Sequence, residues 1–145
     1  MRKLANKVQF SLSNNLQTIA QRTLPQAFEQ ALLKSTIVIR NNVIKKLSGQ
    51  GTGRLYRVPA TKRTYRASAA GLPPAVRLGH LRNSYRYIVE GQGWDAVGYV
   101  GSDIEYSHYL EYGTYKMKPR PHLVPAMQES KPQVCLLYTS DAADD

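Results

Sequence analysis

The pattern of hydrophobic and polar positions predicts one long helix in the first third of the chain. Apolar residues recur with a 3.6-residue spacing over about two dozen residues. They are Phe28, Ala31, Leu32, Ile39, Val43, Ile44 and Leu47. Thr23 is expected to be the N-cap, with Pro25 in the first turn and Gln26 closing a capping box, and Gly49 is expected to end the helix as its C-cap. The pattern therefore predicts a helix over Thr23–Leu47 with a buried stripe.

Strand patterns lie on both sides of this helix. Val8–Leu12 alternates apolar and polar residues, and a short helical stretch from Ser13 follows it. Further along, Tyr85–Val89 and Ala96–Gly101 flank a glycine-rich turn, which predicts an antiparallel hairpin.

The C-terminal third is predicted to hold a short helix and the start of another. The first covers Tyr106–Tyr112 and stops at Gly113, Lys116–Pro121 is extended by its prolines, and a last helix begins at His122. The expected fold class is α+β, with one long helix packed on a small antiparallel sheet, a long basic loop and a short C-terminal helix.

Residues 50–79 form the basic loop, which is punctuated by glycine and proline. It carries six cations, Arg54, Arg57, Lys62, Arg63, Arg66 and Arg77, and no acid. A ragged hairpin across Arg54–Val58 and Thr61–Arg66 is one interpretation. Because like charges repel and the loop has few large apolar residues, we expect it to be flexible in the isolated subunit and to become ordered against a partner.

The length of the chain and its uneven charge add two expectations, one about domains and one about partners. With 145 residues the chain makes one domain, which we place at residues 1–134. Residues 1–89 hold sixteen lysines and arginines against a single acid, Glu29. Such an asymmetry indicates a polyanion or an acidic protein as partner, although a solvated basic face is the simpler alternative.

Residues 135–145 differ from everything before them. They match one reading frame of a transposon-based sequencing adapter, which leads to the hypothesis that the native chain diverges near Val134. The alternative is a short acidic tail. We therefore leave this segment, with the sole cysteine, Cys135, out of the expected fold.

Motifs for catalysis are missing from the sequence. No G-x-S-x-G elbow is present, the glycines at 51–53 lack a Walker lysine, and the N-terminus leads into no apolar signal segment or membrane span. His108 and Glu111 could form a metal pair but have no third ligand nearby. We expect no enzyme, no cofactor, no metal, no small-molecule substrate and no membrane association.

Several phrases, in order, resemble a known family. Tyr65–Val76 and Gly79–Ser84 are similar to a family stretch written A-P-G-x-P-P-A-x-D-T-G-x-L-R-x-S. Val100–Thr114 is similar to V-G-x-x-x-x-Y-A-x-Y-x-E-x-G-T, and Pro119–Ala126 to P-R-P-F-L-x-P-A. The order resembles the neck, minor tail-component or tail-completion proteins of long-tailed phages. Four positions depart from the pattern: Ala70 replaces a proline, Arg77-Leu78 replaces Asp-Thr, and His122 replaces a phenylalanine.

The resemblance implies a virion structural protein at the head–tail junction or the top of the tail. It would act as a homo-oligomeric ring that meets head-connector and tail proteins, first in the host cytoplasm and then in the virion. Three groups of residues are expected to matter. The subunit or partner interface comprises Tyr106, Tyr109, Leu110, Glu111, Tyr112, Gly113, Lys116, Met117, Pro119, Arg120 and Pro121. The family-motif turn comprises Pro73, Pro74, Gly79, Leu81 and Arg82. Arg54, Arg57, Lys62, Arg63 and Arg66 would face DNA passing the lumen or an acidic partner.

The rival interpretation is a small basic nucleic-acid-binding module. Tyr56 and Tyr65 are interleaved with the cations of the basic loop, and such rings can stack on unpaired bases while arginines and lysines bind phosphates. The sequence leaves both interpretations open.

Overall fold

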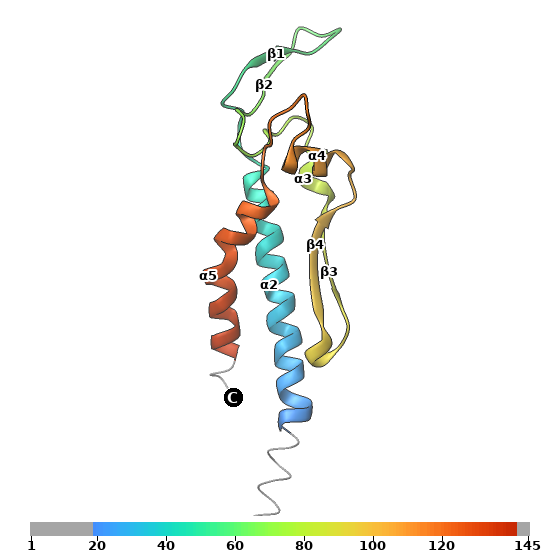
Figure 1. Cartoon of the computed structure of the whole chain (residues 1–145), viewed down its shortest axis with the longest axis vertical. Coiled ribbons are helices and arrows are strands. Elements are labelled where there is room, and N and C mark those ends of the chain that lie inside the picture. Colours follow the sequence, from blue (N-terminus) through green and yellow to red (C-terminus); the bar gives the residue numbers. More distant parts are fainter. Residues whose placement is uncertain (1–18, 142–145) are drawn as a thin grey trace, which may run out of the picture.

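The computed structural model describes residues 19–141 of the chain, with side chains described for residues 21–139. It is an elongated α+β structure built along one long helix (Figure 1). The helical elements are η1 (Ile19–Thr23), α2 (Leu24–Lys46), α3 (His80–Ser84), η2 (Gly93–Asp95), α4 (Tyr106–Tyr112) and α5 (Leu123–Asp141). The strands are β1 (Leu55–Arg57), β2 (Thr64–Arg66), β3 (Tyr85–Glu90) and β4 (Val97–Ser102). The predicted strand Val8–Leu12 lies outside the described residues.

Helix α2 confirms the long predicted helix, but both of its expected caps are wrong. Thr23 has helical dihedral angles, φ −76° and ψ −48°, and makes no side-chain capping hydrogen bond, so the capping box with Gln26 does not form. The π-helical turn η1 precedes Leu24, so the chain enters α2 already helical. At the other end Leu47 donates its backbone N–H to Val43, and Gly49 does not have the left-handed backbone of a C-cap.

The buried face of α2 differs from the predicted stripe. Ala31 and Val43 are buried as expected, but Ser35 and Thr36 are buried with them, while Leu32 and Ile39 are only half-buried. Both hydroxyls donate to backbone carbonyls of the helix itself, Ser35 to Ala31 at 2.6 Å and Thr36 to Leu33 at 2.8 Å, which satisfies them without an outside partner. Small side chains on this face allow another element to approach closely.

The β3–β4 hairpin packs against α2. It confirms the hairpin predicted from Tyr85–Val89 and Ala96–Gly101. Its antiparallel register runs from the pair Tyr85–Ser102 to the pair Glu90–Val97. A Cβ atom on Gly98 would lie 2.3 Å from Cγ2 of Thr36 and 3.3 Å from Cδ1 of Leu32. Glycine at position 98 therefore sets how close the sheet lies to α2.

The same register divides the hairpin into two faces. Tyr85, Val89 and Gly98 belong to the face that packs on α2, whereas the cross-strand pair Ile88–Tyr99 belongs to the outer face. Ile88 and Tyr99 are 55% and 54% exposed. Within the described chain, each strand of this sheet pairs only with the other. Both outer edges of the sheet therefore lack a β partner.

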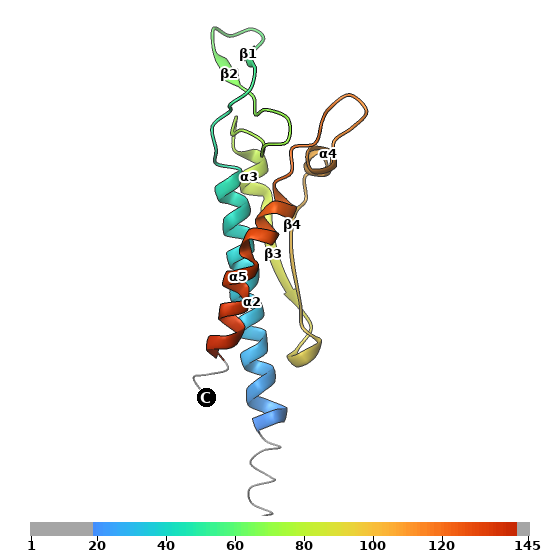
Figure 2. The ribbon, with the colours of Figure 1, turned by 60° about the vertical axis from the view of Figure 1, so that its left-hand side comes forward.

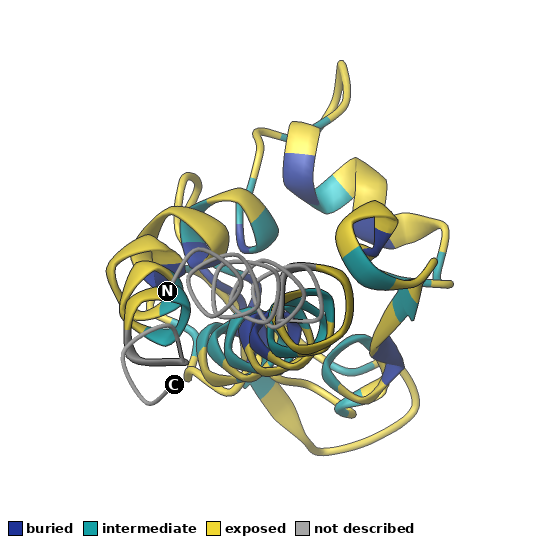
Figure 3. Cartoon of the chain, turned by 90° about the horizontal axis from the view of Figure 1, so that it is seen from below, coloured by how far each residue is buried: buried dark blue, intermediate teal, exposed yellow. Residues whose placement is uncertain are grey.

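Helix α5 packs along α2, which lies between α5 and the hairpin (Figures 1 and 2). Ala126 and Ser130 are fully buried in this contact. Asn42 donates to Ser130 Oγ at 2.7 Å, and Lys46 forms an ion pair with Glu129 at 2.6 Å. Val43, Leu47, Tyr85 and Ala126 make the small core, and Figure 3 shows buried residues as short dark-blue segments on a ribbon that is otherwise exposed or intermediate.

The last helix is longer than predicted. It continues past Pro132 and includes the adapter-like residues up to Asp141, whereas the sequence predicted only a short C-terminal helix beginning at His122. Helical propensity and the contact of Tyr138 with Phe28, at 6.0 Å between ring centroids, are compatible with this extension.

The basic loop contains the hairpin that the sequence indicated. Strands β1 and β2 pair antiparallel with Tyr56 opposite Tyr65, and the hairpin projects beyond the end of α2 (Figure 1). Its base is narrow because residues 51–53 run against residues 66–69. A Cβ on Gly51 would lie 1.8 Å from the carbonyl oxygen of Arg66, so only glycine fits there.

Candidate functional site

A cleft of about 500 Å³ lies between the base of the β1–β2 hairpin, the segment leading into α3, and α4. We call it the cationic cleft. Its apolar lining comes from residues such as Tyr65, Val76, Leu81, Tyr106 and Leu110. A volume of this size is in the usual range of a binding site.

Three arginines, Arg77, Arg82 and Arg120, line the cationic cleft, and the lining contains no acidic residue. The guanidinium of Arg77 stacks over the ring of Tyr65, with 4.7 Å between Cζ and the ring centroid. None of the ion pairs found among the described residues involves these three arginines. The cleft therefore presents uncompensated positive charge on an apolar wall.

Two buried polar atoms in the same lining also lack partners. Within the described part of the chain, neither Ser68 Oγ nor Arg120 Nε has a hydrogen-bond partner, although the Ser68 side chain is buried. Buried polar groups are nearly always satisfied in native proteins. These two unpartnered donors, beside three arginines, suit a ligand that carries a hydrogen-bond acceptor with negative charge.

The cationic cleft brings together several residues that the sequence placed in separate groups. From the family-motif turn, Pro74, Gly79, Leu81 and Arg82 line it, whereas Pro73 does not. Gly79 has φ +78° and precedes α3, a left-handed conformation that favours glycine. From the expected interface, Tyr106, Leu110 and Arg120 form the opposite wall. Segments far apart in sequence thus converge on one cleft.

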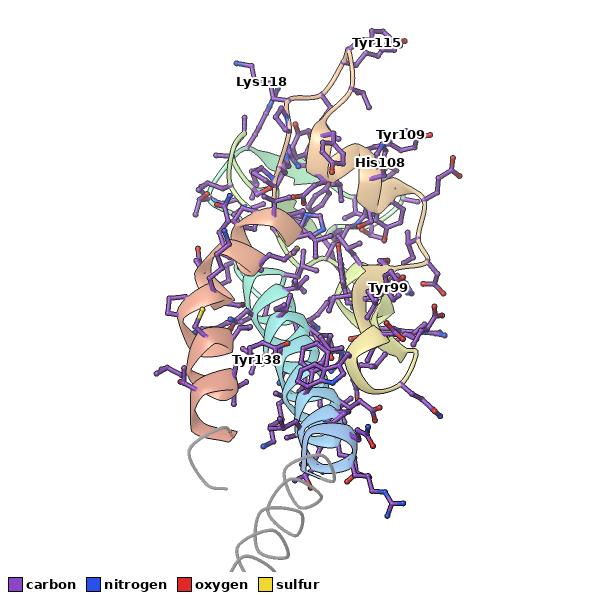
Figure 4. All side chains as sticks on the ribbon, turned by 60° about the horizontal axis from the view of Figure 1, so that its bottom comes forward. Tyr99, His108, Tyr109, Tyr115, Lys118 and Tyr138 are labelled. Carbon is purple, nitrogen blue, oxygen red and sulfur yellow. The ribbon has the colours of Figure 1, made fainter. Side chains whose placement is uncertain are left out.

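The other aromatic residues of α4 lie on the opposite side of that helix. Tyr109 and Tyr112 line a second depression of about 470 Å³, with Asp103, Glu105 and His108, so Tyr109 does not share a cleft with Tyr106 and Leu110. We call Tyr99, Asp103, Glu105, Tyr109 and Tyr112 the tyrosine face. The labelled side chains of Tyr99 and Tyr109 project outward on the hairpin side of the molecule (Figure 4).

The segment predicted to be extended, Lys116–Pro121, belongs to the loop of residues 113–121, which we call the arm. The arm is anchored at its base and exposed at its tip. Arg120 N–H donates to the carbonyl of Leu110 at 2.7 Å, and Gly71 N–H donates to that of Pro119 at 3.0 Å. Thr114 and Met117 pair across a tight turn whose tip holds Tyr115, which is 92% exposed and points away from the body (Figure 4). The remaining interface candidates, Gly113, Lys116 and Pro121, belong to the same loop.

Glu111 is a correction to the expected interface, because it lies inside the fold. Its side chain is 6% exposed, and its carboxylate accepts the backbone N–H groups of His122, Leu123 and Val124 at 2.8, 3.0 and 2.9 Å. These are the first N–H groups of α5, which have no partner within the helix. Glu111 therefore caps α5 from α4.

His122 completes a buried polar network around Glu111. Nδ1 of His122 lies 3.0 Å from Glu111 Oε2 and 3.2 Å from the carbonyl of Arg120, so this nitrogen carries the proton. Nε2 lies 2.7 Å from the hydroxyl of Tyr85, which lies 2.9 Å from Ser107 Oγ. The position where the family has phenylalanine is thus a fully buried ring here as well, with hydrogen bonds added.

Burial and hydrogen bonding shift the pKa values of Glu111 and Tyr85 in opposite directions. Burial alone would raise the pKa of Glu111, but the three backbone N–H donors and the nearby His122 together hold its pKa below the ordinary value. Burial raises the pKa of the Tyr85 hydroxyl, against a lowering effect of the Ser107 hydrogen bond. A carboxylate, an imidazole and a phenol in line resemble a proton relay. Because His122 and Tyr85 are closed to solvent, we assign the network a structural role: it holds α4, α5 and β3 together.

Sequence reasoning missed this network because nothing local signals it. It paired Glu111 with His108, three residues away, whereas the structure pairs it with His122, eleven residues away, and leaves His108 exposed. His108 instead contacts the ring of Tyr112, at 4.8 Å between centroids. Among residues 21–139, no three side chains of the metal-binding types gather to hold an ion.

The five cations proposed to face DNA or an acidic partner all lie on the β1–β2 hairpin and are all exposed. On one face of the hairpin Tyr56 and Tyr65 stack at 5.6 Å with an angle of 22° between their rings. Arg54 lies over Tyr56 at 5.8 Å. The hairpin therefore combines aromatic rings and cations on one surface, and the flexibility of this loop in the isolated subunit stays a prediction.

None of the helices within residues 19–141 has both the length and the apolar character that crossing a bilayer requires. Comparisons of the chain with protein-family models, with curated proteins and with solved structures find no match.

Proposed function

We propose that this chain is a structural protein of a phage virion, a ring-forming neck or tail-completion component at the head–tail junction or the top of the tail. Its role is assembly, without catalysis, and its partners are copies of itself and the adjoining head-connector and tail proteins. The proposal starts from the family resemblance of the sequence, and the geometry supports it in one specific way.

The supporting observation is the apolar surface that the described chain leaves uncovered. The outer face of the β3–β4 hairpin exposes the Ile88–Tyr99 pair, α4 exposes Tyr109 and Tyr112, and the arm exposes Tyr115. A two-stranded sheet is marginal by itself and is normally covered or extended. Aromatic residues at such positions are typical of protein interfaces, since they combine apolar area with a polar tip. Neighbouring subunits would cover this surface.

The direct test is the oligomeric state of the full chain. Native mass spectrometry and negative-stain electron microscopy are expected to show closed rings of one stoichiometry. In a propagating phage that carries this gene, a nonsense codon is expected to leave separate heads and tails. A chain that stays monomeric up to about 100 µM, a concentration at which even weak specific contacts associate, would contradict the proposal.

A second candidate function, nucleic-acid binding, is favoured by the β1–β2 hairpin. Its stacked Tyr56 and Tyr65, with Arg54 and Arg77 over the rings, combine cations with aromatic rings. This is the combination that binds single strands through phosphate contacts and base stacking. In a ring, the same hairpin could line a lumen that DNA crosses.

Salt dependence tests this candidate. If the hairpin binds DNA, each neutralised phosphate adds about 0.7 for a single strand, or about 0.9 for a duplex, to the magnitude of the slope of log K against log salt. Changing Arg54, Arg57, Lys62, Arg63 and Arg66 together to glutamine is expected to flatten that slope while the melting temperature stays unchanged. A variant with an unchanged slope, or one that still completes infectious particles normally, would remove the hairpin from this role.

A further inference from the structure

We infer that the cationic cleft is the subunit contact of this protein, and that its ligand is the tyrosine face of a second copy, with Asp103 and Glu105 entering between Arg77, Arg82 and Arg120. This inference rests on the proposed ring and names the surfaces that build it.

The cationic cleft and the tyrosine face have complementary charge. The cleft holds three arginines and no acid, whereas the depression on the other side of α4 holds Asp103 and Glu105 and no arginine or lysine. Asp103 has only a loose, exposed pairing with Arg86 at 3.8 Å, and Glu105 accepts a hydrogen bond from Tyr109 at 3.1 Å. Both carboxylates are exposed, so a partner's cations can reach them.

The unsatisfied donors of the cleft carry the second step. Ser68 Oγ and Arg120 Nε are buried without partners in the described chain, and a buried donor without a partner is unfavourable. A carboxylate that enters the cleft supplies the missing acceptor when the side chains that cover these two atoms move aside. Val76, Leu78 and Tyr106, which are exposed around it, supply apolar area for the rings of Tyr109 and Tyr112. This mixed apolar and cationic lining suits a protein segment better than a phosphate backbone.

The geometry of α4 carries the third step. Tyr106 and Leu110 line the cationic cleft, while Tyr109 and Tyr112 line the depression opposite, so the two surfaces lie on the two sides of one short helix. A contact between two different surfaces of identical subunits is heterologous, and it closes into a ring when the rotation between neighbours divides a full turn.

Two charge-reversal variants test this contact. R77E/R82E reverses the charge of the cleft, and D103R/E105R reverses the charge of the tyrosine face. Each variant is expected to weaken self-assembly by about 100-fold or more, because like charges then meet at the contact. Mixed in equal amounts, the two variants present complementary surfaces at every contact, so rings with alternating subunits are expected to return. The quadruple variant in one chain is also expected to restore assembly.

The matched control is R57E/R63E on the β1–β2 hairpin, which changes the same number of charges away from the cleft and is expected to leave assembly unchanged. Circular dichroism and melting curves establish that every variant is folded. If the wild type forms rings and R77E/R82E forms them equally well, this inference is wrong while the proposed function stands. If R77E/R82E keeps its rings but loses DNA binding, the cleft is a nucleic-acid site. A wild type that never assembles overturns both proposals.

Discussion

The carboxylate of Glu111 and the ring of His122 meet inside the protein, with 3.0 Å between Oε2 and Nδ1, and the same carboxylate accepts the first backbone N–H groups of α5. One side chain thus joins α4 to α5 and fixes where the last helix begins. Because α4 separates the cationic cleft from the tyrosine face, this internal contact also positions both proposed interaction surfaces.

Replacing Glu111 by alanine is expected to destabilise the protein by about 3 kcal/mol, because it leaves buried donors of α5 and His122 without an acceptor. The free energy of unfolding in urea measures the effect. Glu129→Ala is the control, since its ion pair with Lys46 is largely exposed on the glutamate side and is expected to cost less than about 1 kcal/mol. Equal costs for the two variants would show that Glu111 is not a buried cap.

Lowering the pH is expected to decrease the free energy of unfolding through the protonation of Glu111. The pKa of Glu111 is lower in the folded protein than its ordinary value of 4.5, so the unfolded state binds the proton first as the pH falls. The stabilisation is complete above the ordinary value and is lost as the pH drops through the lower folded pKa. Urea unfolding from neutral pH down to about pH 3 is expected to show a larger loss for the wild type than for Glu111→Gln. Parallel pH profiles would contradict this.

Gly98→Ala is expected to cost about 1–3 kcal/mol, because the new Cβ would overlap Cγ2 of Thr36 and push β4 away from α2. Gly101→Ala, in the same strand, is the matched control: nothing lies within 4 Å of its added Cβ, so its cost is expected to stay under about 0.5 kcal/mol. Thermal unfolding of both variants makes the comparison. A Gly98→Ala variant as stable as Gly101→Ala would refute the close contact between helix and sheet.

Core substitutions compare two residues of the predicted stripe of α2 that differ in burial. Val43 is fully buried, whereas Ile39 is half-buried. Val43→Ala is expected to cost about 2 kcal/mol and Ile39→Ala no more than that, although the isoleucine loses more atoms. Chemical denaturation measures both. A clearly larger cost at Ile39 would restore the stripe that the periodicity predicts.

Removing residues 135–145 is expected to cost about 0.5–1.5 kcal/mol, because it removes the contact of Tyr138 with Phe28, whereas Cys135 and Leu136 are exposed. Melting curves of the chain ending at Val134 and of the full chain test this. Separately, sequencing the source DNA beyond codon 134 tests the adapter hypothesis, which ordinary genomic codons would refute.

The elements that the sequence alone determined are those whose signal is local. The 3.6-residue spacing from Phe28 to Leu47 identified α2, alternation around a glycine-rich turn identified the β3–β4 hairpin, and Gly113 marked the end of α4. The α+β class follows from these elements together. Their periodicity survives in the structure because it reflects which side of a helix or strand can face a core at all.

The tertiary structure decided how these elements meet, and that depended on residues far apart in sequence. Thr36 is buried where Gly98 brings β4 against it, and Thr23 is no cap because η1 continues into α2. The convergence of Ser68, Arg82 and Arg120 on one cleft, and the pairing of Glu111 with His122, arise only when α4 and α5 dock. Hydrogen bonding and burial act through space, so the periodicity of a single segment carries no record of them.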